Sequence, residues 1–412
     1  MKKAILILNA IMLMQFSFAQ TFTNYSTADG LISNNVQCVY ANSSSDIWFG
    51  TQLGVSQFDG ATWTTYEMAT YPGMADDNIL SIYVDGLDQT WIGTDFGTSF
   101  FNGATWTTYT TADGLDNNKV QCINQDAEGN MWFGTINGLS KFDGASWTTF
   151  GTGDGLPFGG INSITLHSDG DLWFGTGLGG IAIYDGTDFI EITEDEGLIS
   201  DKIRAIEFAP DGKSWVATAE GLSTFDAANT FLNSHTTIFT IPDPDTLNPI
   251  VDVKIDGNGV VWAGVYVDYL VTEGGVCAYN GSTWFEFDVS DGLAGPVVNG
   301  LSIDDNNDVW VATSTGITKI SDHTLATADY KQISFSTYPN PTMSELTISF
   351  DNVSSQATVV ELYTISMRQV SSYNVEPNES ILNINLESLE NGIYLLMSQV
   401  PQIWVLVIMR VY

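Results

Sequence analysis

Apolar residues recur in short runs along the first 320 residues, and turns that carry Gly or Asp separate one run from the next. The stretch Gly129–Thr135 is representative, with a turn glycine followed by Met-Trp-Phe-Gly-Thr. Four such runs follow one another before the pattern repeats, which predicts a unit of four short antiparallel strands. In the copy around this stretch we expect strands at 120–125, 131–135, 139–142 and 147–150.

The pattern is periodic. Its tryptophans are separated by 43, 41, 41, 42, 47 and 48 residues, namely Trp48, Trp91, Trp132, Trp173, Trp215, Trp262 and Trp310. A period in the low forties, made of strands and turns, is typical of propeller blades. Strands this short need neighbours, so the units must stack. Seven copies predict an all-β, seven-bladed β-propeller.

In four copies the outermost strand begins with a Gly-Ala/Ser-Thr/Ser-Trp tag, and the last copy has neither this tag nor such a strand. Residues 21–25 (Thr-Phe-Thr-Asn-Tyr) near the N-terminus have the character of that strand, and Asp29-Gly30-Leu31 supplies its exit turn. We therefore expect the N-terminal strand to pair with the last blade and close the ring, because closure removes exposed strand edges.

The residue types found at three positions of the repeat have a physical reason. Each tryptophan offers a large apolar plate for the neighbouring blade. The glycine or alanine two residues later leaves room for the next backbone. The residue nine before each tryptophan is always aliphatic, which predicts inner strands buried on both faces; these residues are Val39, Ile82, Ile123, Ile164, Ile206, Val253 and Leu301.

Outside the repeat, residues 1–19 have a charged start, an apolar run and a small-residue end, the pattern of a secretory signal peptide. The net charge of −37 disfavours nucleic acid and anionic lipid as partners. Three cysteines are an odd number. Cys38 and Cys122 occupy one repeat position, ten before the tryptophan, where other copies have Ser, Ala, Asp or Gly. We expect free, buried thiols.

The sequence also resembles a known repeat. Asp113-Gly114-Leu115, Val120, Asp126, Trp132 to Thr135 and Gly138-Leu139 follow the pattern of the two-component-regulator propeller repeat. The resemblance covers roughly residues 21 to 320 and implies a ligand-sensing propeller of the kind found outside the cytoplasm, often responsive to glycans. The sequence has no spanning helix or kinase segment after the propeller, so a ligand-binding role is expected rather than signalling through a kinase.

After a polar linker at 321–332, residues 333–412 resemble the C-terminal sorting domain of the Bacteroidetes type IX (Por) secretion system. The resemblance rests on Tyr338-Pro339-Asn340-Pro341 and on Asn391-Gly392-Ile393-Tyr394-Leu395-Leu396. It implies contact with that secretion machinery and a location at the cell surface or outside the cell. Alternating apolar residues predict a small β-sandwich. The final run, 400–412, either replaces the family's last strand or is aberrant.

In a propeller the loops between the second and third strands, and the connections into each inner strand, share one face around the central channel. We call it the channel-mouth face, and it is the default binding site. Inner strands start there, eleven residues before each tryptophan, and five of the seven residues at this position are polar. The predicted ligand-binding residues are Gln37, Gln121, Asn162, Arg204 and Asn299 at the strand starts, Phe96, Asn137 and Glu220 on the loops, and Tyr266, Asp268 and Tyr269 on the irregular loop of the sixth blade.

Signals for catalysis are few. The three histidines fall in separate turns and linkers, and no nucleophile elbow or His-Glu-x-x-His motif occurs. Residues 304–308 (Asp-Asp-Asn-Asn-Asp) have the acidity of a calcium loop but lack its glycine and distal glutamate. We expect no cofactor, with calcium as an open alternative. The sequence thus predicts a secreted, surface-attached, non-enzymatic propeller that binds an extracellular glycan or protein; the alternative is a metal-assisted lyase or hydrolase that uses acidic residues.

Overall fold

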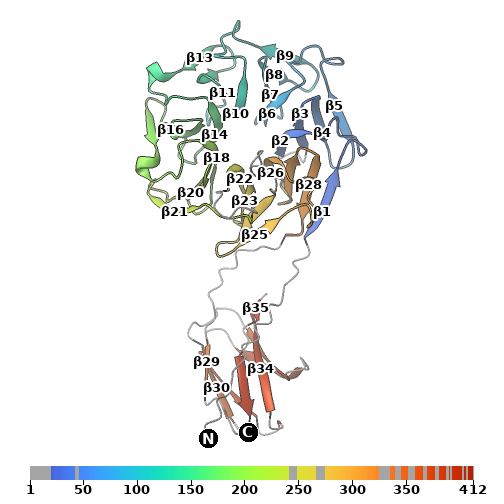
Figure 1. Cartoon of the computed structure of the whole chain (residues 1–412), viewed down its shortest axis with the longest axis vertical. Helices are drawn as coiled ribbons and strands as arrows, with labels where there is room; N and C mark the ends of the chain where they lie inside the picture. Colours follow the sequence, from blue (N-terminus) through green and yellow to red (C-terminus); the bar gives the residue numbers. More distant parts are fainter. Residues whose placement is uncertain are drawn as a thin grey trace. The chain divides into compact units, whose positions relative to one another are not determined.

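The computed structural model describes residues 20–41, 46–240, 248–265, 274–323, 335–338, 345–350, 358–364, 369–375, 380–386, 389, 392–400, 403–404 and 407–411. They belong to two compact units, Met1–Thr327 and Ala328–Tyr412. The first unit is the predicted seven-bladed propeller, with one four-stranded antiparallel sheet per blade (Figure 1). The loop with Tyr266, Asp268 and Tyr269 lies outside the described residues.

Each blade runs from an inner strand at the channel to an outer strand at the rim. Blades 1 to 3 are β2 (Val36–Ala41), β3 (Ile47–Thr51), β4 (Gly54–Phe58) and β5 (Trp63–Tyr66); β6 (Ile79–Val84), β7 (Thr90–Thr94), β8 (Thr98–Phe101) and β9 (Trp106–Tyr109); and β10 (Val120–Gln125), β11 (Met131–Thr135), β12 (Leu139–Phe142) and β13 (Trp147–Phe150). All four strands predicted for the third copy are confirmed.

The remaining blades follow the same order. They are β14 (Ile161–Leu166), β15 (Leu172–Thr176), β16 (Ile181–Tyr184) and β17 (Phe189–Ile192); β18 (Ile203–Phe208), β19 (Ser214–Thr218), β20 (Gly221–Phe225) and β21 (Phe231–His235); β22 (Ile250–Ile255), β23 (Val261–Val265), β24 (Val276–Tyr279) and β25 (Trp284–Phe287); and β26 (Val298–Ile303), β27 (Val309–Thr313) and β28 (Gly316–Ser321). Two short 3-10 turns, Thr152–Asp154 and Glu194–Glu196, follow blades 3 and 4.

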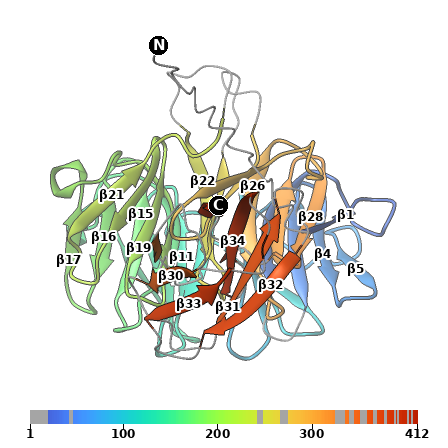
Figure 2. The same cartoon turned by 90° about the horizontal axis from the view of Figure 1, so that it is seen from below.

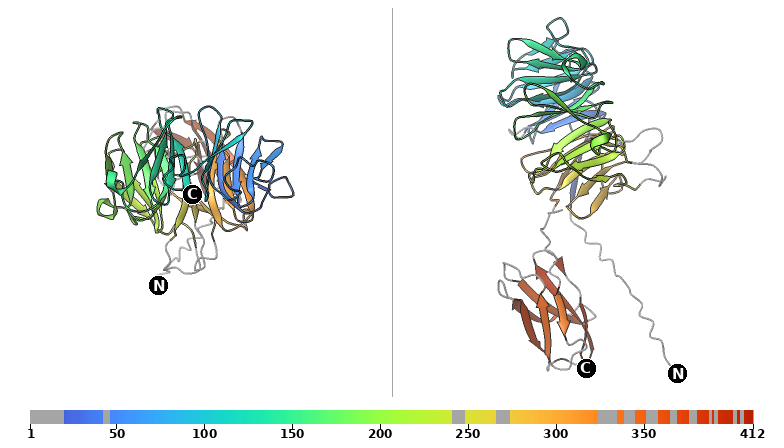
Figure 3. Two further views of the ribbon diagram at one scale, coloured as in Figure 1. Left: turned by 90° about the horizontal axis from the view of Figure 1, so that it is seen from above. Right: turned by 90° about the vertical axis from the view of Figure 1, so that its left-hand side faces the viewer.

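The N-terminal strand closes the ring as predicted. β1 (Thr21–Tyr25) pairs antiparallel with β28, from Thr21 opposite Ser321 to Tyr25 opposite Ile317, and so completes blade 7. Figure 2 shows β1 beside β28, and Figure 3 gives two further views of the same ring. The Asn24 side chain makes two long-range hydrogen bonds: its Nδ2 donates to the carbonyl of Gly292, and its Oδ1 accepts from Thr318 Oγ1.

The repeat tryptophans form the core between blades, and all seven are under 10% exposed. In six blades the tryptophan stacks on the ring that ends the outer strand, for example Trp132 on Phe150 at 5.4 Å and 19°. In blade 3 the glycine behind the plate allows close approach of the next blade, because a Cβ at Gly134 would lie 2.8 Å from Ile161 Cγ2. Burial of these seven large apolar side chains stabilises the stacked ring.

Two expectations need correction. Inner strands are not buried on both faces; β2, for example, is buried only at Val36 and partly exposed from Gln37 to Ala41, because one side of the strand borders the central channel. All three cysteines are free, as expected, but only Cys277 is fully buried, while Cys38 and Cys122 are intermediate. Burial nevertheless raises the pKa of Cys38 to about 12.

The second unit contains two sheets. One pairs β29 (Phe335–Tyr338), β30 (Glu345–Phe350) and β33 (Ile381–Asn385), and the other pairs β32 (Gln369–Val375), β31 (Thr358–Thr364), β34 (Gly392–Val400) and β35 (Ile403–Trp404). Both contribute to one core, which includes Leu346, Ile348, Leu362, Ile384 and Tyr394. The terminal run forms β36 (Val407–Val411), which pairs with β34 and so takes the place of a last strand.

Within the part of the chain that the model describes, we find no helix with the length and hydropathy needed to span a membrane.

Candidate functional site

The seven inner strands line the central channel, and all of them share one irregularity. In each, the pairing register shifts between the first and third residue, as between Val36 and Cys38 or between Val298 and Gly300. A β-bulge leaves one residue unpaired and redirects its side chain. The bulged residue is the one eleven before each tryptophan, and all seven line a cavity of about 570 Å³: Gln37, Leu80, Gln121, Asn162, Arg204, Val251 and Asn299. The structure thus brings the five predicted strand-start residues together.

Several of these polar side chains are satisfied by the neighbouring blade. Asn162 Nδ2 donates to the carbonyl of Ile203 at 2.7 Å, and Gln121 Nε2 donates to Asn162 Oδ1 at 3.3 Å. Asn299 Nδ2 donates to the carbonyl of Val36 at 2.7 Å and so crosses the closure of the ring. Part of the polar ring therefore serves to join the blades, and it presents a fixed set of amide groups to the cavity.

A second polar network extends from the cavity onto the channel-mouth face. Gln37 Nε2 donates to Asn78 Oδ1 at 2.7 Å, and Asn78 Nδ2 donates to Asp95 Oδ2 at 2.9 Å. Lys119 Nζ lies 2.9 Å from Asp95 Oδ1, with side chains 43% and 32% exposed. The hydrogen bond from Lys119 is the main reason that the pKa of Asp95 is lowered. Asn78 and Lys119 escaped the sequence reasoning, because they lie in the connections between blades.

Large apolar side chains surround this mouth on blades 1 to 4. They lie at the loops between second and third strands and in the connection into blade 4, and their exposed fractions are 44–74%: Leu53, Phe96, Ile136, Phe158 and Leu178. We call these five residues the apolar rim. Ile136, Phe158 and Leu178 are close neighbours. The two glycines that directly follow Phe158 make these contacts, because Gly160 packs against Ile136 and Gly159 packs against Leu178. Asn137 and Glu220 are exposed at the corresponding loops of blades 3 and 5.

The other half of the cavity carries a charge cluster that sequence reasoning missed. Lys254 Nζ lies 3.2 Å from Glu207 Oε2 and 3.6 Å from Asp252 Oδ1. Burial opposes the charge of Lys254, but the two carboxylates outweigh it and raise the pKa of its amine. Burial raises the pKa of Glu207 despite this ion pair. A signal existed, because the position eight before each tryptophan is polar or aromatic in all seven copies: Tyr40, Tyr83, Asn124, Thr165, Glu207, Lys254 and Ser302.

In the described part of the channel, groups suited to metal-assisted chemistry do not converge. Among the described residues, no three His, Cys, Asp or Glu side chains are placed to hold a metal ion together. His167 pairs with Asp169 in a turn between strands, at 2.6 Å. In the stretch considered for calcium, Asp304 accepts the indole N–H of Trp310 at 2.9 Å and the backbone N–H of Asn306 and Asp308, which is a turn role.

Comparisons with known proteins agree with this fold. The family model described as "Two component regulator propeller" matches residues 114–137 and 155–177, and the "Secretion system C-terminal sorting domain" matches residues 336–402. The chain therefore carries propeller repeats of that kind and a sorting domain for secretion to the cell surface or beyond it. A comparison with curated protein sequences gave no match.

Solved structures with the same fold come from several bacteria. The extracellular domain of the B. thetaiotaomicron protein BT3049, described as a hybrid two component system, is 20% identical with a TM-score of 0.62 over 95% of this chain and 57% of that one. PorZ, described as a surface component of the type-IX secretion system of Porphyromonas gingivalis, is 16% identical with a TM-score of 0.60 over 93% of this chain and 60% of that one.

An enzyme also shares the fold. An inactive variant of virginiamycin B lyase from Staphylococcus aureus, solved with quinupristin, is 14% identical with a TM-score of 0.57 over 73% of this chain and 99% of that one. The chain spans less than two thirds of the length of the first two structures. At these identities the similarity shows the fold.

Proposed function

We propose that the secreted propeller is a non-catalytic binding module that holds a protein partner on its channel-mouth face. The apolar rim carries this proposal: Phe96 is 64% exposed and Phe158 is 74% exposed, and Leu53, Ile136 and Leu178 are exposed as well. Soluble proteins rarely leave several large apolar side chains exposed together, and such patches mark sites of protein contact.

The surroundings of the rim define the partner's chemistry. The network of Gln37, Asn78, Asp95 and Lys119 adds polar groups with fixed geometry at the mouth. An apolar rim beside oriented polar groups suits a peptide segment, whose backbone has donors and acceptors. The net charge of −37 favours a partner that is neutral or basic. A glycan is the alternative ligand for the same face. Tyr266, Asp268 and Tyr269 remain predicted ligand-binding residues for that alternative.

A selection experiment tests the proposal. The full-length chain is immobilised and challenged with a phage-displayed peptide library, and convergent peptides are measured against variants. We expect apolar, neutral or basic peptides whose affinity falls at least tenfold for Phe96→Ser combined with Phe158→Ser. Leu87→Ser is the matched control, because Leu87 is 78% exposed in the Asp85–Gln89 turn at the opposite face.

Two results would contradict the proposal. The first is a selection that yields no convergent peptide, and the second is peptides that bind the double variant as well as the unmodified chain. A glycan array with the same variants runs in parallel. Glycan binding that depends on Phe96 and Phe158, without peptide binding, would replace the protein partner by a carbohydrate at this face.

A further inference from the structure

Hydrogen bonds fix the orientation of the amide side chains in the wall of the channel cavity. Asn162 Nδ2 donates to the carbonyl of Ile203 at 2.7 Å. Asn299 Nδ2 donates to the carbonyl of Val36 at the same distance. A backbone carbonyl can only accept a hydrogen bond, so the amide atom that faces it must be the nitrogen. The oxygen of each of these two amides therefore lies at the other end of the group.

The same reasoning orients the two glutamines of the wall. Asn162 uses its nitrogen on a carbonyl, so its Oδ1 accepts from Gln121 Nε2 at 3.3 Å. Asn78 uses its nitrogen on the carboxylate of Asp95, so its Oδ1 accepts from Gln37 Nε2 at 2.7 Å. Both glutamines thus spend an N–H on the protein, and the oxygen of each amide is left over.

Three amide oxygens remain as acceptors in this wall: Gln37 Oε1, Gln121 Oε1 and Asn299 Oδ1. Within the described part of the chain, we find no hydrogen bond donated to any of the three. All three residues are partly exposed at the cavity. An amide oxygen has two lone pairs and no proton, so a ligand must bring donors to this place.

One of these oxygens lies directly below the apolar rim. A Cβ at Gly160 would lie 3.1 Å from Gln121 Oε1 and 3.0 Å from the Cα of Ile136, so the three residues meet at one point. Ile136 belongs to the apolar rim, and Gly160 follows Phe158 by two residues. A segment held on the rim would therefore bring its side chains within reach of the amide oxygens.

Charged side chains at the cavity cancel one another. Arg204, Asp252 and Lys254 belong to its wall, and Glu207 lies against Lys254 at 3.2 Å. These two cations and two carboxylates add no net charge. The selection of a ligand thus falls to the hydrogen-bonding groups and to the net charge of the chain, which is −37 and attracts cations.

We propose that the channel cavity takes the ammonium group of a lysine side chain, supplied by the protein partner that the apolar rim holds; this inference rests on the proposed function. An ammonium group has three N–H donors and no acceptor, which suits oxygens that lack a donor. A neutral amide or hydroxyl brings an acceptor of its own, and an anion meets only acceptors. A guanidinium is a planar fork that fits paired carboxylate oxygens better. Leu80, in the same wall, offers apolar surface to the lysine methylene groups.

A short probe tests the cavity separately from the rim. Nα-acetyl-lysine N-methylamide is titrated into the full-length chain, and the side-chain amide signals of Asn and Gln are followed by NMR. The titration is run at a salt concentration of about 0.15 M, which screens attraction to the acidic surface. We expect saturable shifts for Gln37, Gln121 and Asn299. The same probe with an acetylated Nε keeps the length without the charge and should bind at least about tenfold more weakly.

Strand β10 offers a matched pair of variants. Gln121→Met removes one acceptor oxygen and keeps the length of the side chain, so the lysine probe should bind at least about fivefold more weakly. Gln125→Met is the control, because Gln125 lies at the other end of the strand with both ends of its amide occupied. Its Oε1 accepts from the backbone N–H of Gly86, and its Nε2 donates to the carbonyl of Gly129. This control should leave the affinity within about twofold, and thermal unfolding verifies that both variants are folded.

The outcomes distinguish this inference from the proposed function. Phe96→Ser combined with Phe158→Ser should weaken the selected peptides and leave the lysine probe unaffected. The inference is overturned if the lysine probe gives no saturable shifts, if the acetylated probe or the matching arginine probe binds as well, or if Gln121→Met binds like the unmodified chain. Peptide binding on the rim would stand in each of these cases. Saturable binding of the lysine probe without any selected peptide would support the ammonium site and overturn the protein partner on the rim.

Discussion

At the scale of single residues, the aspartate six positions before a repeat tryptophan organises a whole turn. Asp126 Oδ2 accepts the indole N–H of Trp132 at 2.8 Å, and Oδ1 accepts the backbone N–H of Asn130 at 2.7 Å and of Glu128 at 3.1 Å. Trp132 is 1% exposed, so its N–H cannot find water instead. The Asp126 carboxylate thus ties the first turn of the blade to Trp132, the side chain that packs against the next blade.

Removing this carboxylate should be costly. We expect Asp126→Ala to lower the free energy of unfolding by about 2–4 kcal/mol, because a buried indole N–H and two backbone donors lose their acceptor. Asp143→Ala is the matched control: Asp143 also accepts two backbone N–H groups, from Ala145 and Ser146, but in an exposed turn. The Asp143→Ala variant should lose clearly less stability, because its turn donors can bond to water instead. Urea unfolding followed by tryptophan fluorescence measures both, and equal losses would contradict the prediction.

The stability difference between the unmodified chain and Asp126→Ala should also depend on pH. Burial opposes ionisation of Asp126, but hydrogen bonds from Trp132 and Asn130 outweigh it and hold the pKa of this carboxyl below its ordinary value. A lowered folded-state pKa means that the stabilisation is complete above the unfolded-state pKa of about 3.9 and is lost as pH falls through the folded-state value. The gap between the unmodified chain and Asp126→Ala should therefore narrow from pH 7 to pH 3. A constant gap would contradict this assignment.

At the scale of elements, blade 7 differs from the others because it combines both ends of the propeller's chain. Tyr25 of β1 stacks on Trp310 at 5.7 Å and 22° and lies 5.4 Å from Phe58 of blade 1. Five other blades get the equivalent ring from their own outer strand, as blade 2 does with Tyr109 on Trp91 at 6.0 Å and 23°. The ring is therefore held shut at blade 7 by strand pairing and packing, without a covalent turn between β28 and β1.

Loss of the closing ring should loosen two distant segments together. For Tyr25→Ala we expect amide hydrogen exchange to accelerate at least tenfold in both β1 and β28, because they open as a unit. The stacked ring contributes about 2–3 kcal/mol at a partly exposed site. Tyr109→Ala removes an equivalent ring and should accelerate exchange in β9 without affecting β1 or β28. Exchange measured by mass spectrometry would contradict the prediction if both variants gave the same pattern.

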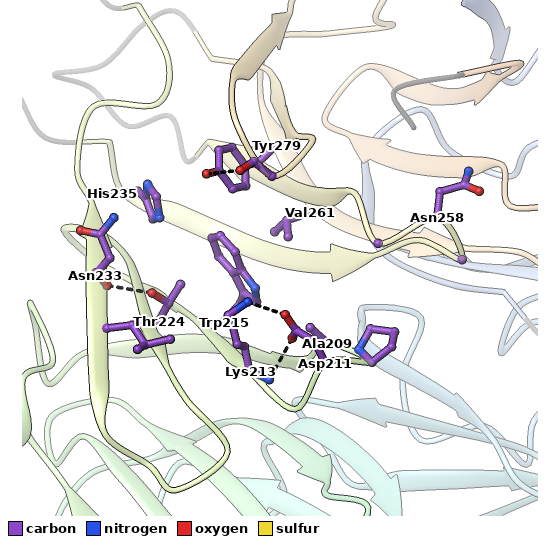
Figure 4. A pocket seen from close by; sticks show the side chains of 15 residues that line it. Ala209, Asp211, Lys213, Trp215, Thr224, Asn233, His235, Asn258, Val261 and Tyr279 are labelled. Atoms are coloured by element: carbon purple, nitrogen blue, oxygen red, sulfur yellow. Dashed lines mark hydrogen bonds and ion pairs between the residues drawn. The ribbon is translucent and has the colours of Figure 1, made fainter. Parts of the chain in front are cut away.

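What could be predicted follows from what the repeat encodes. Strand positions and the closing strand were predictable, because each blade is a template for the next and Thr21–Tyr25 matches the strand missing from the last copy. The polar residues at Gln37 and Asn162 were also predictable, but their roles were not. Those depend on the shared bulge and on which neighbour carbonyl lies within reach. The cavity beside Trp215 (Figure 4) was missed, because Ala209, Thr224 and Leu232, which line it, are unremarkable singly and meet only once the register is known.

At the scale of the whole molecule, the last described residue of the propeller unit is itself part of the core. His323 follows the final repeat strand, yet it is 6% exposed. Its Nε2 lies 2.5 Å from the carbonyl oxygen of Asn307 in blade 7, and its Nδ1 lies 3.5 Å from Asp256 Oδ2 in blade 6. No copy of the repeat offers a template for a residue at this place, so sequence reasoning assigned it to a linker.

His323 should therefore act as a clamp between blades 6 and 7. We expect His323→Ala to lower the free energy of unfolding by about 2 kcal/mol, because the packing on Trp262 and the contact with Asn307 are lost. It should also accelerate hydrogen exchange in β28, which ends two residues earlier at Ser321. His323→Lys tests the analogy with Lys141, which lies over Trp132 and beside Asp126 in blade 3. A cation beside Asp256 should recover at least half of the loss. Were His323→Ala to unfold and exchange like the unmodified chain, the residue would be an ordinary part of the linker, and its packing on Trp262 would have no bearing on how the propeller holds its final strand.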